Sequence, residues 1–328
     1  MGSTNPKIFI VIVTWNGMKW MKECLESIRK STIHASTVII DNGSTDSTCE
    51  FIKKNYPEIK LLETGKNLGF GQANNVGIRY AFDNGADYVY LLNQDAYVYP
   101  DMFEKLLAVS ENPAHADLGI LSPLHVHGCR TRLDSQFKGY LKSIGTDFLE
   151  DCTMGEPQEV YHVDCVPAAG WFIPKATLER IGGFDPIFFH YGEDHHYAQR
   201  VKYHGLKVGV VPAAKMVHDR DGFGNETMAK KGVVMRNLET EVYLNINNSL
   251  GRQLYMFFNK YFFFVVYSGK EIARGNGRLV LQQIAAIGKS IVRIPKYCKN
   301  RKANKKQSML WLQRKEIVEL AGKIGKNG

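Results

Sequence analysis

Two short polar motifs carry the side chains best suited to chemistry. Asn93-Gln94-Asp95 ends the β-prone apolar run Val89–Leu92, and the carboxylate pair Glu193-Asp194 follows much later. A carboxylate just beyond a buried strand lies where open α/β sheets bind ligands. One acidic site that holds a divalent cation and another that accepts a proton suit the transfer of a group from a diphosphate. A single aspartate is compatible with Mg²⁺ or Mn²⁺, because substrate phosphates often complete such sites.

Other predicted strand ends supply further polar candidates. Thr14 and Asn16 follow the apolar run Ile8–Val13, and Asp41 follows Thr37–Ile40. If these strands are parallel, their ends line one crevice, and Asp41 could accept the ring N–H of a uracil or thymine. The alternative is that Asp41-Asn42-Gly43 only forms a turn, since these residues are common in turns.

The segment Gly69–Asn74 nearly spells a dinucleotide-binding fingerprint. It follows a strand signal and opens a helix, but Asn74 replaces the third glycine and the loop follows the third strand rather than the first. We interpret it instead as a nucleotide-contacting loop, in which Asn67, Asn74 and Asn75 supply polar contacts.

Two of the candidates have plain structural alternatives. His218 is by default a structural histidine, and it becomes a candidate ligand only if the fold brings it to Asp95. Glu193 and Asp194 begin a predicted helix, where the helix dipole favours acids. That role explains one carboxylate better than two.

The positive charge of the chain is concentrated at one end. The net charge is +9 over 328 residues, and 44% of the residues are apolar, enough for a sizeable core. Residues 251–328 hold 17 lysines and arginines against three glutamates, a net +14, which leaves −5 for residues 1–250. A slightly acidic body argues against nucleic-acid binding, whereas the basic tail predicts an anionic partner, lipid headgroups first of all.

Cysteine use and the polar start of the chain predict a cytoplasmic protein. The six cysteines form no Cys-x-x-Cys pair, which indicates reduced thiols rather than a zinc site or a disulfide frame. Residues 1–6 are polar, so we expect no cleavable signal peptide.

Strand and helix signals alternate through the first half of the chain, which predicts an α/β fold with a doubly wound, mostly parallel sheet. After about residue 118 we expect strands without regular helices between them, including residues 139–148 and 159–167. A mobile polar loop is expected over 213–231. The other predicted strands cover residues 8–13, 37–40, 59–62, 88–92, 118–122 and 207–211, and the predicted helices cover residues 18–29, 71–82, 100–110, 175–181 and 194–204.

From about Met235 the chain is predicted to be helical, amphipathic and basic. Residues 254–267 hold eight aromatic residues but are too short to span a bilayer. This segment either packs on the core or on a partner subunit of a homo-oligomer, or it lies on a membrane surface. The basic stretch 296–306 either faces solvent or contacts anionic lipid.

Five ordered motifs together resemble family 2 of the glycosyltransferases, which have the GT-A type nucleotide-diphospho-sugar transferase fold. They are Thr14-Trp15-Asn16, Asp41 through Asp46, Asn67 through Gly77, Asn93-Gln94-Asp95, and Gly183-Phe184-Asp185 leading to Glu193-Asp194. Asn93-Gln94-Asp95 and Asn74-Asn75 are most similar to the rhamnosyltransferase-like and galactofuranosyltransferase-like branches. The resemblance implies a GT-A catalytic domain over residues 1–232, with a nucleotide-binding half to about 117 and an acceptor-binding half from 118. A helical, basic region would occupy 233–328.

The resemblance also implies a role for each candidate. Asp95 would ligate Mg²⁺ or Mn²⁺ on the donor diphosphate, with His218 as a second metal ligand. Asp194 would be the general base on the acceptor hydroxyl, and Glu193 would orient the acceptor. Gly170 and Trp171 would shape the acceptor pocket, the indole face stacking on a sugar. The donor site would comprise Thr14, Asn16, Asp41, Asn67, Gly69, Asn74, Asn75, Asn93 and Asp95.

These roles describe an inverting transfer of rhamnose, galactofuranose or another hexose from a UDP- or dTDP-sugar to a glycan or lipid-linked acceptor. The enzyme would work at the inner face of the cell membrane, reached through residues 251–328. One rival is a nucleotidyltransferase or other nucleotide-sugar enzyme, disfavoured because no glycine- and lysine-rich phosphate loop follows the first strand. Another is a non-catalytic partner subunit, motivated by the single aspartate of the metal motif.

Overall fold

The computed structural model of the chain describes residues 6–220, 238–273 and 277–324, and these form two compact units. The first unit combines the residues up to 220 with those from 307 onward, and the second lies within 221–306. The predicted domain boundary at residue 232 lies outside the described residues. The last helix, α14 (Lys315–Ala321), belongs to the first unit, where it packs against α3 (Phe70–Asp83).

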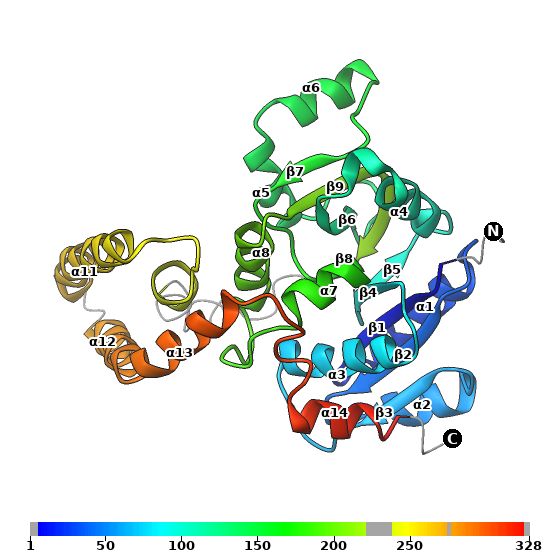
Figure 1. Cartoon of the computed structure of the whole chain (residues 1–328), viewed down its shortest axis with the longest axis horizontal. Coiled ribbons are helices and arrows are strands. Elements are labelled where there is room, and N and C mark those ends of the chain that lie inside the picture. The colour runs from blue at the N-terminus through cyan, green and yellow to red at the C-terminus, as the bar shows by residue number, and fades with distance from the viewer. Residues whose placement is uncertain (1–5, 221–237, 274–276, 325–328) are drawn as a thin grey trace. The chain divides into compact units, whose positions relative to one another are not determined.

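A nine-stranded sheet forms the centre of the first unit (Figure 1). Its order is β3-β2-β1-β4-β8-β6-β9-β5, and β7 pairs with β9. The first four strands are parallel, as are β6 and β9, whereas β5, β7 and β8 run antiparallel to their neighbours. The strands are β1 (Ile8–Thr14), β2 (Ser36–Asp41), β3 (Lys60–Glu63), β4 (Tyr88–Asn93), β5 (Ala96–Val98), β6 (Leu118–His127), β7 (Tyr161–Val163), β8 (Gly170–Pro174) and β9 (Lys207–His218).

Helices cover both faces of this sheet, because the strands carry apolar side chains on both sides. In β1, Phe9 and Val11 join one core, and Ile8, Ile10 and Ile12 join the other. The first core is closed by α3, α14, α5 (Phe137–Leu141), α7 (Lys175–Ile181) and α8 (Glu193–Tyr203). The second is closed by α1 (Met18–Arg29), α2 (Thr48–Asn55) and α4 (Met102–Glu111). The predicted α/β fold is confirmed.

Three parts of the predicted element order are corrected. Residues 139–148 are helical rather than a strand, since α5, η2 (Lys142–Ile144) and α6 (Asp147–Met154) occupy this region. The apolar residues Phe137, Leu141, Ile144 and Phe148 recur at helical intervals and pack on the first core. Strand β9 continues through residue 218 into the predicted loop 213–231, whose part from 221 lies outside the described residues. The short strands β5 and β8 were not predicted, and a 3₁₀ turn, η1 (Pro113–His115), follows α4.

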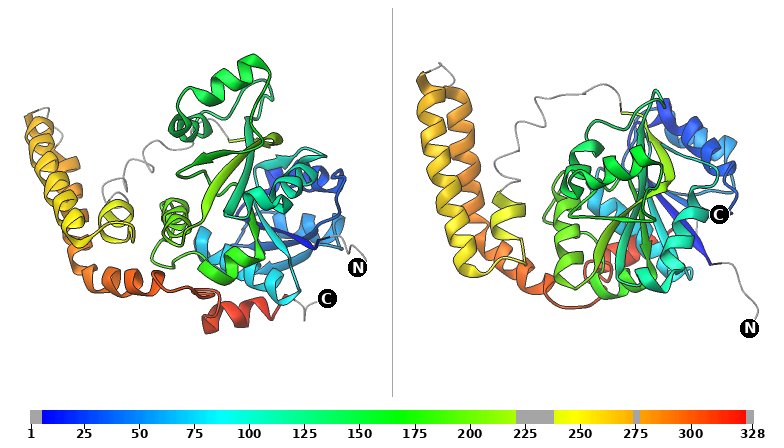
Figure 2. Two further views of the ribbon diagram at one scale, coloured as in Figure 1. Left: turned by 45° about the horizontal axis from the view of Figure 1, so that its top comes forward. Right: turned by 90° about the horizontal axis from the view of Figure 1, so that it is seen from above.

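The second unit is helical, as predicted. One π-helical turn, η3 (Leu238–Tyr243), precedes α11 (Leu250–Ala273), α12 (Gly277–Val292) and α13 (Ile294–Asn304). Helices α11 and α12 lie side by side (Figure 2). The Tyr243 ring stacks on Tyr297 with centroids 4.9 Å apart, and the Tyr297 hydroxyl donates to Glu239 at 2.7 Å. Among the described residues, none of the helices combines the length and apolar character that crossing a membrane requires.

Candidate active site

A pocket of about 310 Å³ opens where β1, β2 and β4 end at one edge of the sheet. Four of the residues predicted for the donor site line this strand-end pocket: Asn67, Gly69, Asn93 and Asp95. The other residues lining it are Val13, Trp15, Asn42, Phe70, Gln94, Phe189 and His190. The pocket therefore joins three strand ends with the segment just before α8.

The fold brings His218 to Asp95, which was the condition for making it part of the site. Strand β5 pairs with β9 so that Ala96 lies opposite His218. The Nε2 atom of His218 lies 3.4 Å from Oδ1 of Asp95. The carboxylate is partly exposed to the pocket, whereas the imidazole is buried.

Gln94 joins the ends of β1 and β4, a role that sequence reasoning missed. Its side-chain oxygen accepts hydrogen bonds from the Thr14 hydroxyl at 2.7 Å and from the Trp15 N–H at 2.9 Å. Thr14 is buried, and Trp15 is 53% exposed at the rim of the pocket. A strand-end amide between two residues already singled out was the signal that could have identified Gln94.

Asp41 and Asn16 organise the loop that follows β2. The buried Asp41 carboxylate accepts the backbone N–H groups of Gly43 and Ser44, both at 3.1 Å. Asn16, at φ +48°, accepts the Thr45 N–H at 2.8 Å. The turn predicted as the alternative for Asp41 is therefore present, and neither side chain lines the strand-end pocket.

The loop before α3 is tied to the segment before α8. The Asn67 side-chain oxygen accepts from Asn42 Nδ2 at 2.9 Å and from the Gly69 N–H at 2.8 Å. Gly69 has φ +81°, and a Cβ there would lie 2.2 Å from the Phe189 carbonyl oxygen. Only glycine fits this conformation and this close approach.

Asn74 and Asn75 lie inside α3 rather than on the pocket, which corrects their predicted contacts with a nucleotide. Both are buried, and the Asn74 amide donates to the carbonyl of Phe70 in its own helix at 3.0 Å. The Asn75 amide binds both backbone groups of Phe184, donating at 2.9 Å and accepting at 2.7 Å. This double contact fixes the turn that leads toward α8.

Glu193 and Asp194 form the first turn of α8, after Gly192 at φ +94°. Glu193 is buried, whereas Asp194 is partly exposed and its Oδ1 accepts the His195 N–H at 2.8 Å. The Tyr140 hydroxyl lies 3.3 Å from Nε2 of the neighbouring His195, so the start of α8 lies beside α5. Burial and then the charge of Asp194 raise the pKa of the Tyr140 phenol. Neither acid lines the strand-end pocket. Phe189 and His190, in the segment before α8, do line it.

Trp171 and Gly170 are core residues, which corrects their predicted place in the acceptor pocket. The Trp171 side chain is fully buried in β8, where its indole stacks on Phe184 with ring centroids 5.8 Å apart. Its Nε1–H donates to the Val166 carbonyl at 3.2 Å. A Cβ at Gly170 would lie 2.4 Å from Met216 Sδ, so packing accounts for this glycine. Both faces of the sheet are buried here, and an aromatic residue in β8 therefore enters the core.

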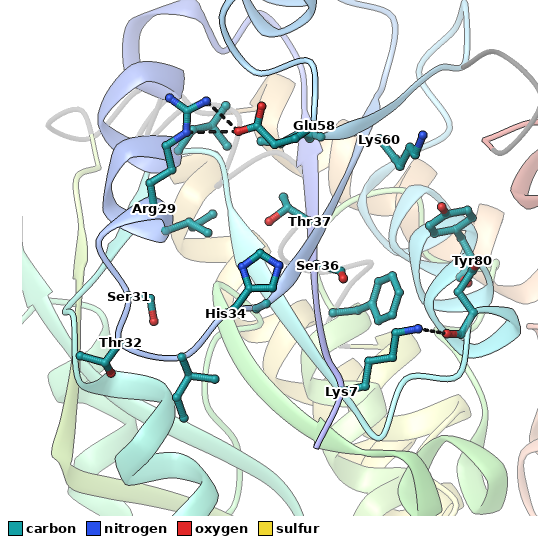
Figure 3. Close-up of a pocket in the computed structure, with 17 residues that line it drawn as sticks. Lys7, Arg29, Ser31, Thr32, His34, Ser36, Thr37, Glu58, Lys60 and Tyr80 are labelled. Carbon is teal, nitrogen blue, oxygen red and sulfur yellow. Dashed lines mark hydrogen bonds and ion pairs between the residues drawn. The ribbon is translucent and has the colours of Figure 1, made fainter. Parts of the chain in front are cut away.

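A larger cavity, of about 510 Å³, lies at the amino ends of β1, β2 and β3 (Figure 3). Three of its charged groups are paired: Arg29 pairs with Glu58 at 2.7 Å, and Lys7 Nζ donates to the Asn84 carbonyl at 2.7 Å. Glu58 is the one carboxylate among the described residues that line it. None of the predicted site residues faces this cavity, so we do not assign the predicted chemistry to it.

Two protein-family models match the first unit. The one described as Glycosyl transferase family 2 matches residues 9–132, and the one described as Glycosyl transferase family group 2 matches residues 88–227. Together the matches run from β1 through β9. The chain belongs to glycosyltransferase family 2.

Its curated relatives include rhamnosyltransferases. The N-acetylglucosaminyl-diphospho-decaprenol L-rhamnosyltransferase of Mycobacterium tuberculosis is 28% identical over 234 residues, covering 64% of this chain and 75% of the relative. The dTDP-rhamnosyl transferase RfbF of Shigella flexneri is 24% identical over 215 residues, covering 65% and 69% respectively. This family 2 glycosyltransferase is therefore rhamnosyltransferase-like, and it transfers a sugar from a nucleotide sugar.

A solved structure supports the GT-A fold. The mannosyltransferase PcManGT from Pyrobaculum calidifontis, in complex with GDP-Man and Mn²⁺, superposes with a TM-score of 0.53 at 14% identity. The match covers 98% of this chain and 87% of that one. This likeness confirms the predicted fold.

The residues at the strand-end pocket fit a divalent cation of the kind the family implies. Asp95 offers a partly exposed carboxylate there. Within residues 6–220, 238–273 and 277–324, no group of three or more His, Cys, Asp or Glu side chains is placed to hold a metal. Mg²⁺ commonly takes one or two carboxylates and completes its coordination with substrate phosphates and water. The phosphates of a donor would thus supply the missing oxygen ligands.

Proposed function

We propose that this protein is an inverting glycosyltransferase that moves rhamnose, galactofuranose or another hexose from a UDP- or dTDP-sugar to a glycan or lipid-linked acceptor. The observation that carries the proposal is the partly exposed Asp95 carboxylate in the strand-end pocket, in a chain whose relatives are rhamnosyltransferases. The names of those relatives contain dTDP-rhamnose and a diphospho-decaprenol acceptor, which supports the donor and acceptor classes.

Asp194 is the group we assign as general base. It would take the proton of the acceptor hydroxyl, whose oxygen then attacks the anomeric carbon as the bond from that carbon to the diphosphate oxygen breaks. The nucleoside diphosphate leaves, and a single displacement inverts the anomeric centre. A cation held by Asp95 would offset the charge of the departing diphosphate. Glu193 would orient the acceptor beside Asp194.

Thermal unfolding with nucleotides tests the donor class. We expect UDP or dTDP to stabilise the protein in the presence of Mn²⁺, and GDP or ADP to do so less. A ligand at a hundred times its dissociation constant adds ~2.7 kcal/mol of stability, which is readily detected. The absence of a shift with all four diphosphates would contradict donor binding. Release of pyrophosphate instead of a nucleoside diphosphate during turnover would favour a nucleotidyltransferase.

Trp15 is the group we assign to stacking on the nucleobase, since its half-exposed indole lies at the pocket rim. Trp15→Ala is expected to weaken binding of the preferred nucleotide about tenfold or more, because base–aromatic stacking contributes ~1–3 kcal/mol per base. Trp15→Phe keeps a stacking ring and should retain most of the affinity in the same titration. Equal affinities for the alanine variant and the parent would rule out this role.

We further propose that the second unit binds an anionic membrane surface. Exposed apolar side chains recur along α11 at helical intervals: Leu250, Leu254, Tyr255, Phe258 and Phe262. Helix α13 adds the exposed lysines Lys296, Lys299 and Lys302. Apolar contact combined with basic residues is the pattern of helices that lie in the headgroup region. The structure does not describe four side chains of the predicted aromatic cluster, those of Tyr261, Phe263, Phe264 and Tyr267.

Liposome co-sedimentation tests the membrane proposal. The full chain is expected to bind vesicles with anionic lipid and to bind neutral vesicles weakly, with binding that falls as salt rises. Leu254→Ser combined with Phe258→Ser should reduce the bound fraction severalfold, and Val318→Ser on α14 serves as a control at an exposed apolar residue of the first unit. Unchanged vesicle binding in the double variant would contradict the membrane proposal. If the parent forms a dimer that this variant abolishes, the exposed apolar side chains of α11 contact a second subunit instead.

A further inference from the structure

A row of polar contacts leads from a buried carboxylate to Asp95. Arg220, just after β9, lies with Nε 3.4 Å from Oδ2 of the buried Asp134 and also contacts Gln136. The same Nε donates to Nδ1 of His218 at 3.3 Å. On the other side of the imidazole, Nε2 faces Asp95 Oδ1 at 3.4 Å. His218 thus lies between a guanidinium and a carboxylate, each beside a different ring nitrogen.

The direction of the Arg220–His218 hydrogen bond follows from the chemistry of the two groups. A guanidinium has five N–H donors and no acceptor, so Nδ1 of His218 must supply a lone pair. A neutral imidazole then carries its hydrogen on Nε2, the nitrogen facing Asp95.

We propose that Arg220 fixes His218 as the Nε2–H tautomer, so that His218 orients the Asp95 carboxylate and does not itself ligate the cation. Metal-binding histidines need a lone pair on the ligating nitrogen, and they usually donate their other N–H to a carboxylate or carbonyl. Here the other nitrogen faces a donor, the reverse of that arrangement. The proposal rests on the proposed function in taking Asp95 as the cation ligand, and it replaces the expected second metal ligand with a positioning residue.

Packing around the ring supports a single orientation. His218 is 2% exposed, and the ring of the buried His125 packs edge-on against it with centroids 5.8 Å apart. His125 in turn stacks on Phe137 at 4.3 Å. A half-turn of the His218 ring would place carbon atoms at both polar contacts, losing the bond to Arg220 and the approach to Asp95 together.

Nitrogen NMR of histidine-labelled, metal-free full-length protein reads the tautomer directly. The His218 signal is identified by its loss in His218→Gln. We expect Nδ1 unprotonated and Nε2 protonated in the parent and in Arg220→Lys, which retains a donor-only side chain. In Arg220→Gln the amide oxygen can accept, and the signal should shift toward the Nδ1–H form. A parent spectrum with hydrogen on Nδ1 would overturn the proposal.

Pulsed EPR of the parent with Mn²⁺ and UDP, and with Mn²⁺ and dTDP, tests whether His218 ligates the cation. We expect no directly bound histidine nitrogen in the parent and gain of such a coupling in Arg220→Gln, lost again when His218→Gln is added. A nitrogen coupling in the parent that disappears in His218→Gln would also overturn the proposal. Absence of Mn²⁺ binding with either nucleotide would instead overturn the proposed function, and the metal-free NMR result would still decide the tautomer.

Discussion

Replacing Asp194 by asparagine is expected to lower turnover by ~10²–10⁴-fold while donor binding stays intact, because a positioned general base contributes about that much. The amide keeps the size of the side chain and can still accept the His195 N–H, but it cannot take a proton from an acceptor hydroxyl. Turnover is measured as release of nucleoside diphosphate in the presence of acceptor. Donor binding is measured as the nucleotide-dependent shift in thermal unfolding.

The control for this substitution separates catalysis from helix capping. Asp147 also lies in the first turn of a helix, α6, outside the proposed site, so Asp147→Asn should leave turnover unchanged. If Asp194 only stabilised its helix, Asp194→Asn would cost ~0.3–1 kcal/mol of stability and no more turnover than the control. Parental turnover in Asp194→Asn would refute the base assignment. Donor binding without transfer by the parent to any acceptor would favour the non-catalytic subunit.

The first half of the sheet could be predicted from local patterns, because the burial of each element there imposes an apolar pattern on its own segment of the sequence. The run Ile8–Val13 is apolar throughout since β1 is buried on both faces, and helix α1 matches its predicted bounds residue for residue. In the second half such marks are weak. Strand β5 has three residues, and β8 joins the sheet antiparallel between β4 and β6, a pairing that no local pattern specifies.

The candidate site divides in the same way. Asp95 and Asn93 could be found because a polar trio ends an apolar run, and both line the strand-end pocket. The approach of His218 to Asp95 depends on the β5–β9 pairing, which joins distant parts of the chain and was only stated as a condition. Trp171 was expected at the acceptor because of the family resemblance, whereas its environment in the core is set by tertiary packing. Gln94 and Arg220 act through contacts with distant residues, and Arg220 carries no local signature.

Asp95→Asn is expected to remove the part of nucleotide binding that depends on Mn²⁺, with a loss of affinity of about tenfold or more, which is ~1.4 kcal/mol or more. The Asp95 carboxylate is partly exposed in the strand-end pocket, where it can bind a cation. An amide is a much weaker ligand for a divalent cation. Unfolding is followed with UDP and dTDP, each with and without Mn²⁺. The metal-free shift should persist, because contacts with the base and ribose do not need Asp95.

The matched control is Asp219→Asn, which removes a neighbouring carboxylate. Asp219 accepts the Tyr97 hydroxyl at 3.2 Å, and its backbone N–H donates to the Asp95 carbonyl at 2.8 Å. This variant lowers the local negative charge as much as Asp95→Asn does, so a general electrostatic effect would weaken Mn²⁺-dependent binding in both. Loss in Asp95→Asn alone assigns the cation to the Asp95 carboxylate itself. Equal loss in both variants would mean that the pocket attracts the cation through its net charge, and an unchanged Mn²⁺ response in Asp95→Asn would place the cation elsewhere.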